Sequence, residues 1–308
     1  MFQDPEIFKA ALDNLPVGVY MVDTNRRIVF WSHGAELISG YLAQEVLGRE
    51  CREKFLIDLD ESNPIACGEA CQLTDSMRDG KTREADVLLR HRAGHRIPVH
   101  VRAIPLRNQQ NKIVGATECF EESRYPANDE RRGRPENPGC IDKATGLPDA
   151  NTMTLRLQEC FAECENHRLP FCVLMAEVDQ LPKFHKHGKD AVDAARAVVA
   201  QTLSNALRPG DIVGCWHEDR FLAIIKNCDR SVLKKVGERV RKMESYSEVE
   251  WWGDELPVSV SIGGTVVAEG DQVKLLLERA QAALNCSSKE GGNRVMIFPE
   301  DALGRSES

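Results

Sequence analysis

A short stretch in the second half of the chain gathers residue types that can do chemistry. Its charged tip holds an imidazole, two carboxylates and a guanidinium in a row, followed by an aromatic ring: His217, Glu218, Asp219, Arg220 and Phe221. The apolar runs on both sides predict a strand, a two-residue turn and a second strand. Upstream, Arg208 and Asp211 have the spacing Arg-x-x-Asp. Such groups could bind a divalent metal ion or a phosphate-bearing ligand.

A second group of reactive residues lies in the first half of the chain. Cys67 and Cys71 have C-x3-C spacing, Cys51 precedes them, and His91 and His95 are four residues apart around a turn. Thiolates and imidazoles could hold zinc or iron, and the thiols could form a redox switch. Because C-x3-C is not a standard zinc-knuckle spacing and the two histidines flank a turn, ordinary packing or surface roles are the preferred interpretation.

The composition limits the classes of protein to consider. The chain has 308 residues, of which 42% are hydrophobic, so two globular domains are expected. A net charge of −8 disfavours binding to nucleic acid or to an anionic membrane. No apolar run is long enough to span a bilayer, and no signal peptide is evident. The eleven cysteines are spread along the chain, which does not indicate a disulfide framework. A cytoplasmic location without membrane insertion is therefore expected.

The first 122 residues predict an antiparallel sheet with short helices. A helix is expected at 5–15, strands at 17–23 and 27–31, helices over 34–55 broken by glycines, and strands at 84–91, 96–104 and 113–121. This order, with the segments Leu15-Pro-Val-Gly-Val and His95-Arg-Ile-Pro-Val, resembles a PAS domain. The resemblance implies a five-stranded sheet, a sensor whose ligand the sequence does not identify, and a capacity to form homodimers.

Residues 123–140 differ in composition from the rest and are followed by a second predicted domain. Prolines and glycines preclude a continuous helix there, so a linker is expected. Over 141–308, helices at 151–166, 190–207, 231–243 and 271–287 alternate with strands at 171–178, 212–216, 221–226, 258–263 and 294–298. This alternation predicts a mixed α/β (α+β) sandwich with a mainly antiparallel sheet.

The second domain resembles the GGDEF family of diguanylate cyclases. The resemblance is carried by Asp142-Lys-Ala-Thr-Gly-Leu-Pro-Asp, by the hairpin with its tip at 217–221 and by Val258-Ser-Val-Ser-Ile-Gly-Gly. Such enzymes join two GTP molecules into cyclic di-GMP with a divalent metal such as Mg²⁺. By position, the metal ligands would be Glu177, the carbonyl of Val178 and Asp219. The alternative is that Asp219 is a turn residue and Glu177 a solvated strand end.

Other positions of the expected nucleotide site depart from the family. His217 and Glu218 replace two glycines, which let a nucleotide approach the backbone, and Arg220 replaces an acid. Pro182 and Ser288 stand where phosphate-binding lysines are expected, although Lys289 is adjacent to Ser288. His185 stands where an asparagine reads guanine, whereas Asp193 keeps the acid of the guanine site. These departures predict a degenerate GGDEF domain that has lost cyclase activity.

The resemblance also implies a second nucleotide site. Arg208 and Asp211 match the family's inhibitory site, where cyclic di-GMP docks, and Arg239 aligns with its second arginine. Arginine forks bind phosphate and stack on guanine, while a carboxylate accepts from guanine N1 and N2. The alternative is that Arg208 ends a helix, Asp211 starts a strand and Arg239 is a solvated helix residue.

Three functional hypotheses remain. The leading one is a cytosolic bacterial signalling protein with a PAS sensor and a degenerate GGDEF domain that binds cyclic di-GMP or a partner signalling protein. The second is an enzyme that makes cyclic di-GMP from GTP weakly, or accepts another nucleotide. The third is an interaction scaffold without either ligand.

Overall fold

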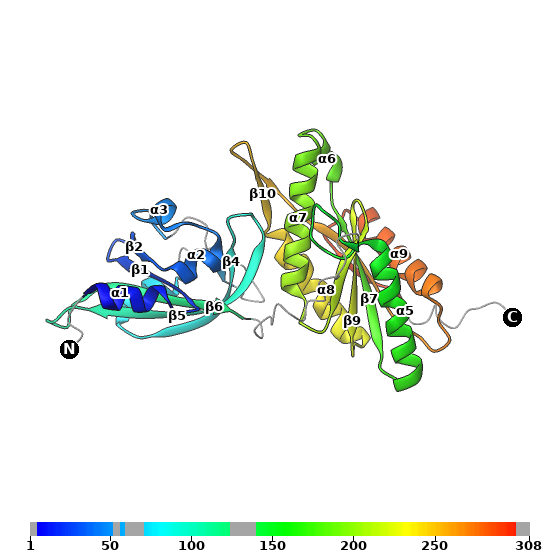
Figure 1. The fold of residues 1–308 in the computed structure, drawn as a ribbon, viewed down its shortest axis with the longest axis horizontal. Helices are drawn as coiled ribbons and strands as arrows, with labels where there is room; N and C mark the ends of the chain where they lie inside the picture. The colour runs from blue at the N-terminus through cyan, green and yellow to red at the C-terminus, as the bar shows by residue number, and fades with distance from the viewer. Residues whose placement is uncertain (1–4, 52–55, 59–70, 124–139, 300–308) are drawn as a thin grey trace. The chain divides into compact units, whose positions relative to one another are not determined.

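The computed structural model describes residues 5–51, 56–58, 71–123 and 140–299, which form two compact units divided near residue 126. Both are visible in Figure 1. The linker expected at 123–140 falls almost entirely outside the described residues, as does Cys67.

The first unit is built on one antiparallel sheet. Its strands are β1 (Gly18–Asp23), β2 (Ile28–Trp31), β3 (Leu56–Asp58), β4 (Arg83–Arg90), β5 (Arg96–Arg107) and β6 (Ile113–Glu122), in the order β2-β1-β6-β5-β4-β3. The five strands that the sequence predicts are all present, and the three-residue β3 extends the sheet beyond β4. The helices are α1 (Pro5–Asp13), α2 (His33–Ser39), α3 (Ala43–Val46) and α4 (Gln72–Asp79).

Local capping explains where α2 begins and ends. The Ser32 side chain accepts a hydrogen bond from the amide of Ala35, which caps the helix at its N-terminus. Gly40 follows the last turn with φ of 75°, a left-handed conformation that glycine adopts without steric cost. The predicted helical stretch is therefore interrupted at Gly40, as expected.

The interior of this unit is aromatic but contains one carboxyl group. The rings of Tyr20, Trp31 and Phe120 pack with centroids 5.4–6.3 Å apart. Glu118, on β6 between Ala116 and Phe120, is 2% exposed and shares this interior. Its Oε1 has no hydrogen-bond partner among the described residues, while Tyr20 hydrogen bonds to the carboxyl group. Burial raises the pKa of Glu118 to about 8, with a further contribution from nearby Cys71.

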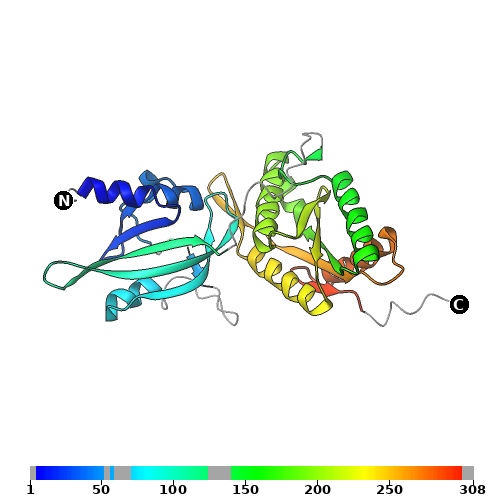
Figure 2. The same cartoon turned by 60° about the horizontal axis from the view of Figure 1, so that its bottom comes forward.

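The second unit is a five-stranded sheet with helices on both faces (Figures 1 and 2). The strands are β7 (Phe171–Val178), β8 (Ile212–His217), β9 (Arg220–Lys226), β12 (Val260–Val266) and β13 (Val295–Ile297), in the order β13-β12-β7-β9-β8. Only β12 and β13 pair in parallel within this sheet, so the predicted mainly antiparallel sheet is confirmed.

Long helices cover the two faces of this sheet. They are α5 (Ala150–His167), α7 (Lys189–Ala206), α8 (Arg230–Ser245) and α9 (Val273–Lys289). Helices α5 and α9 pack against β7 and β9 through a core that includes Met153, Leu276 and Met175. Helix α8 packs on β12, β7 and β13, and α7 packs against α8. The central strand β7 is thus enclosed between helices.

Asp179, directly after the last residue of β7, joins the end of this strand to neighbouring segments. The Asp179 carboxylate accepts hydrogen bonds from the hydroxyls of Ser259 and Ser261, both at 2.7 Å, and from the amide of Asn293 at 2.9 Å. Three segments distant in sequence are thereby joined just beyond Val178. This clamp fixes the backbone that carries Glu177.

The sequence did not predict three small elements of this unit. They are α6 (Leu181–His185) and the hairpin of β10 (Glu248–Trp251) and β11 (Asp254–Pro257). The hairpin turn consists of Trp252 and Gly253, with φ of 51° and 90°. Two positive φ values are typical of the type I′ turn, which favours Asn-Gly.

Replacing Trp252 with asparagine is expected to stabilise this unit by about 1 kcal/mol. Trp252 is 92% exposed and its left-handed conformation costs about 1–2 kcal/mol for a residue with a bulky side chain, whereas asparagine tolerates it. Urea denaturation of the full chain measures the change, with Trp251→Asn as the control that lacks positive φ. An unchanged or lower free energy of unfolding for Trp252→Asn would show that the turn is not strained.

Candidate functional site

The charged tip forms the predicted two-residue turn. Strand β8 ends at His217 and β9 begins at Arg220, and these two residues are paired across the hairpin. His217 and Glu218 are exposed, and neither is among the described residues with positive φ. Side chains at these two positions therefore cause no backbone strain. They do, however, place an imidazole and a carboxylate on the surface that glycines would leave open.

Arg220 links the two carboxylates at this end of the sheet. Its Nε lies 2.7 Å from Glu177 Oε2 and 3.7 Å from Asp219 Oδ1. Its Nη1 donates to Gln281 Oε1 on α9 at 3.2 Å. Glu177 and Arg220 are direct partners in the β7–β9 ladder, so strand register itself brings the charges together.

The environment of Glu177 is thus filled by side chains of this chain. The other carboxylate oxygen of Glu177, Oε1, accepts a hydrogen bond from the Ser288 hydroxyl at 3.4 Å. The two predicted carboxylate ligands do lie together, with Val178 between them, and the Val178 amide donates to the Asp219 carbonyl at 2.9 Å. Among the described residues no three His, Cys, Asp or Glu side chains form a possible metal site. With a guanidinium between its carboxylates, this arrangement does not fit a divalent metal ion.

The predicted guanine-reading residues are found in different environments. His185 is exposed at the end of α6. Asp193 on α7 faces Arg196, with Oδ1 3.6 Å from Arg196 Nη1. Arg196, whose side chain is only 9% exposed, also donates to Asp142 Oδ2 at 2.9 Å. Sequence reasoning missed Arg196, although its spacing of three residues from Asp193 on a helix indicates an ion pair.

Pro182 lies in the first turn of α6, where its missing amide and fixed φ suit a helix start. A phosphate-binding lysine is absent from that position, and the neighbouring Lys183 is exposed. The substitution therefore has a local structural role and supplies no cation.

The Arg-x-x-Asp residues form one hydrogen-bonded group at the opposite end of β9. Asp211 Oδ1 accepts from the Lys226 amide and from Arg208 Nε, both at 3.3 Å, and Oδ2 accepts from the Arg208 amide at 3.3 Å. Arg208 Nη2 donates to the Lys226 carbonyl. The Arg208 side chain is 52% exposed and the Asp211 side chain only 1%. Burial raises the pKa of Asp211, although Arg208 opposes this.

Arg239 completes this group from helix α8. It is exposed and interacts electrostatically with both Asp211 and Arg208. The structure therefore brings together the three residues that the sequence singled out. In this conformation the Asp211 side chain is only 1% exposed. Its carboxylate orients Arg208, and the two arginines form the accessible part of the group.

Comparisons with known proteins identify the families of the two units. The family model described as "Diguanylate cyclase, GGDEF domain" matches residues 140–294, and a PAS domain model matches residues 16–122. The chain belongs to the GGDEF family. Its GGDEF domain carries the two groups of residues described above, and a PAS domain precedes it.

Relatives and solved structures extend this assignment. The chain is 23% identical over 320 residues to "Probable diguanylate cyclase DgcE" of Escherichia coli (strain K12), covering all of this chain and 28% of that protein. It is 27% identical over 127 residues to "Diguanylate cyclase A" of Treponema denticola, covering 41% and 34%. The chain thus spans about a third of the length of these relatives. The GGDEF domain of DgcB from Caulobacter crescentus, solved with c-di-GMP, shares the fold at a TM-score of 0.51 and 23% identity, covering 53% and 97%.

The cysteines considered as ligands lie in the PAS domain. Cys51 and Cys71 are both buried in its core, and Cys67 is outside the described residues. Burial raises the pKa of the Cys51 thiol to about 12, with smaller contributions from Cys71 and Glu118. Cys51 and Cys71 are packed in this core as small apolar side chains.

The two histidines of the PAS domain stack on each other. The rings of His91 and His95 have centroids 4.2 Å apart. Their positions on either side of a turn did not by themselves imply that the rings would meet. Burial lowers the pKa of His95 to about 3 and that of His91 below its ordinary value. Both rings are therefore neutral at physiological pH.

No helix among the described residues is long and apolar enough to cross a membrane.

Proposed function

We propose that this PAS and GGDEF protein binds cyclic di-GMP through Arg208, which Asp211 orients, and Arg239, and that it does not synthesise cyclic di-GMP. The observation that carries the loss of synthesis is the position of Arg220. Its guanidinium lies between Glu177 and Asp219, the two carboxylates that would otherwise bind the metal ion.

A side-chain cation at this position opposes metal binding in two ways. It neutralises the negative charge that attracts a divalent ion, and it leaves the ion next to a like charge. Two unit charges 4 Å apart interact by about 4 kcal/mol at an effective dielectric constant of 20. For Mg²⁺ to bind, the Arg220–Glu177 ion pair at 2.7 Å must first open.

The surrounding residues add to this effect. Glu218 is exposed at the tip, and its carboxylate would repel the triphosphate oxygens of a nucleotide bound there. Asp193 is held by Arg196, so its carboxylate is partly neutralised before any base is read. Phosphoryl transfer depends on positioned cations around the phosphates, and this end of the sheet offers them poorly.

Cyclic di-GMP binding is supported by the exposed guanidinium of Arg208. Its direction is set by Asp211 and the Lys226 carbonyl, which reduces the side-chain entropy lost on binding. Arg239 supplies a second fork on the same surface. Two guanidinium groups suit the two phosphates and two guanine faces of this ligand.

Incubating the purified chain with GTP, with ATP and with their mixture, in Mg²⁺ or Mn²⁺, tests the loss of synthesis. We expect no cyclic dinucleotide by chromatography and mass spectrometry. A product that disappears in the Asp219→Ala variant would instead establish an active cyclase.

Replacing Arg220 with alanine is expected to increase the affinity for Mn²⁺ at least about tenfold, because Glu177 and Asp219 lose their internal cation. Paramagnetic resonance of free Mn²⁺ in the presence of protein measures this. Arg241→Ala, which removes an arginine paired with Glu238 on α8, is the control and should leave Mn²⁺ binding unchanged. Equal affinity in the wild type and the Arg220 variant would show that Arg220 does not occupy the metal position.

A further inference from the structure

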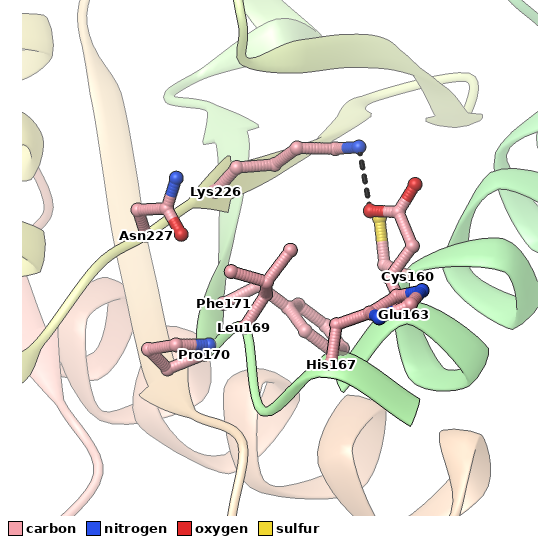
Figure 3. Close-up of a pocket in the computed structure, with 8 residues that line it drawn as sticks. All are labelled: Cys160, Glu163, His167, Leu169, Pro170, Phe171, Lys226 and Asn227. Atoms are coloured by element: carbon pink, nitrogen blue, oxygen red, sulfur yellow. Dashed lines mark hydrogen bonds and ion pairs between the residues drawn. The ribbon is translucent and has the colours of Figure 1, made fainter. Parts of the chain in front are cut away.

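A pocket of about 380 Å³ opens beside the start of β7, away from the charged tip (Figure 3). Its volume lies near the lower end of the range for small-molecule sites, about 300–1,000 Å³. One side consists of apolar residues from the α5–β7 connection and β7, and the other of polar residues from α5 and β9. The lining residues are Cys160, Glu163, His167, Leu169, Pro170, Phe171, Lys226 and Asn227.

Two of the polar lining residues, Lys226 and Glu163, form an ion pair. In Figure 3 the Lys226 side chain extends to Glu163, and Nζ lies 2.8 Å from Oε2. Lys226 is 36% exposed and Glu163 44%. A pair this exposed contributes little to stability and opens readily. A ligand can therefore enter between the two side chains without disturbing the fold.

The charges of the pair determine which ligand fits. An anion that displaced Glu163 from Lys226 would leave a carboxylate beside another anion, and a cation would leave the ammonium unpartnered. A ligand with both charges satisfies both side chains. Leu169, Pro170 and Phe171 then offer an apolar surface for the rest of the ligand. From this geometry we propose that the pocket binds a zwitterionic α-amino acid with an apolar side chain, its carboxylate on Lys226 and its ammonium group on Glu163.

The backbone of Lys226 connects this pocket with the Arg208–Asp211 group. The same residue whose Nζ lines the pocket donates its amide to Asp211 and accepts from Arg208 through its carbonyl. A change in the Lys226 side chain therefore acts on a residue that already orients Arg208. The resonance of the Lys226 amide therefore reports whether the pocket is occupied, and this measurement does not require cyclic di-GMP.

Calorimetric titration of the full chain with L-phenylalanine tests the proposal. N-acetylphenylalanine, which lacks the ammonium group, and phenylalanine amide, which lacks the carboxylate, are the matched probes. We expect each to bind at least about tenfold more weakly than L-phenylalanine, because each leaves one member of the ion pair unpartnered. We also expect the Lys226 amide resonance to shift with L-phenylalanine. Absence of binding at about 10 mM, or equal binding of all three probes, would overturn the proposal.

Two variants assign the contacts. Lys226→Met should remove the preference for L-phenylalanine over phenylalanine amide. Glu163→Gln should remove the preference for L-phenylalanine over N-acetylphenylalanine. The control is Lys274→Met, because Lys274 pairs with Glu278 on α9 at 3.9 Å and neither residue lines the pocket. This variant should leave all three affinities unchanged. Preferences that persist in both pocket variants would place the binding elsewhere and contradict the assignment.

Discussion

Replacing Glu118 with glutamine is expected to abolish a large pH dependence in the stability of the PAS domain. Glu118 is fully buried, and burial raises its pKa from 4.5 to about 8. In the unfolded chain the carboxyl group ionises near its ordinary pKa, whereas in the folded domain it stays protonated. The free energy of unfolding should therefore fall as the pH rises from about 4.5 to 8 and become level above that range.

The expected size of this effect follows from the shift. At about 1.4 kcal/mol per pH unit, a displacement from 4.5 to about 8 corresponds to about 5 kcal/mol. The neutral amide of the Glu118→Gln variant has no proton to lose, so this variant should approach the wild type near pH 4.5 and exceed it most above pH 8. The thiols of Cys51 and Cys71 lie nearby, and the high pKa of Cys51 keeps its thiol neutral over this range.

Hydrogen exchange in urea, followed by mass spectrometry of peptides from β1 and β6, isolates the PAS domain from the GGDEF domain. The control is Glu121→Gln, an exposed residue on the same strand, which should retain the wild-type slope. Parallel curves for the wild type and Glu118→Gln would show that the buried carboxyl group does not control the pH dependence.

Replacing Arg208 with alanine is expected to weaken cyclic di-GMP binding about 100-fold, or about 3 kcal/mol. Loss of a charged hydrogen-bonding partner typically costs about 2–5 kcal/mol, and Arg208 is the arginine whose direction the fold sets. Arg239→Ala should have a smaller effect, because no comparable hydrogen bond orients Arg239 within the described part of the chain. Calorimetry on each variant gives the affinities.

The alanine variant also leaves the buried Asp211 without its guanidinium partner, so folding must be checked separately. Arg208→Lys retains the charge but loses the fork, and we expect intermediate affinity. Arg241→Ala, two residues beyond Arg239 on α8, is the surface control. Wild-type affinity in Arg208→Ala would exclude this surface as the binding site.

The larger elements could be predicted from the sequence because their apolar residues recur with a regular period or form continuous runs. Strand β7, with an apolar run at 171–178, and the four long helices were within two residues of their observed bounds. Helix α6 and the β10–β11 hairpin were missed because each of these elements is only four or five residues long. Trp252 in particular stands at a turn position where asparagine or glycine is the usual signal.

For the site, the sequence identified residues but not their contacts. The sequence showed that Arg220 stands where the family has an acid. Its ion pair with Glu177, however, depends on the β7–β9 register, which no local pattern specifies. The burial of Asp211 depends on the Lys226 backbone, 15 residues away. Arg196 and Gln281 reach the site from helices, and only the packed fold reveals their partners.

The most direct test of the central claim is calorimetric titration of the wild-type chain with cyclic di-GMP, repeated after incubation with GTP and Mg²⁺. If the domain recognises this dinucleotide without making it, the first titration should show binding with a dissociation constant of about 1–10 μM, equivalent to about −7 to −8 kcal/mol. The second should show the same affinity and number of sites. No binding at about 100 μM, or sites already filled after the GTP incubation, would contradict the account.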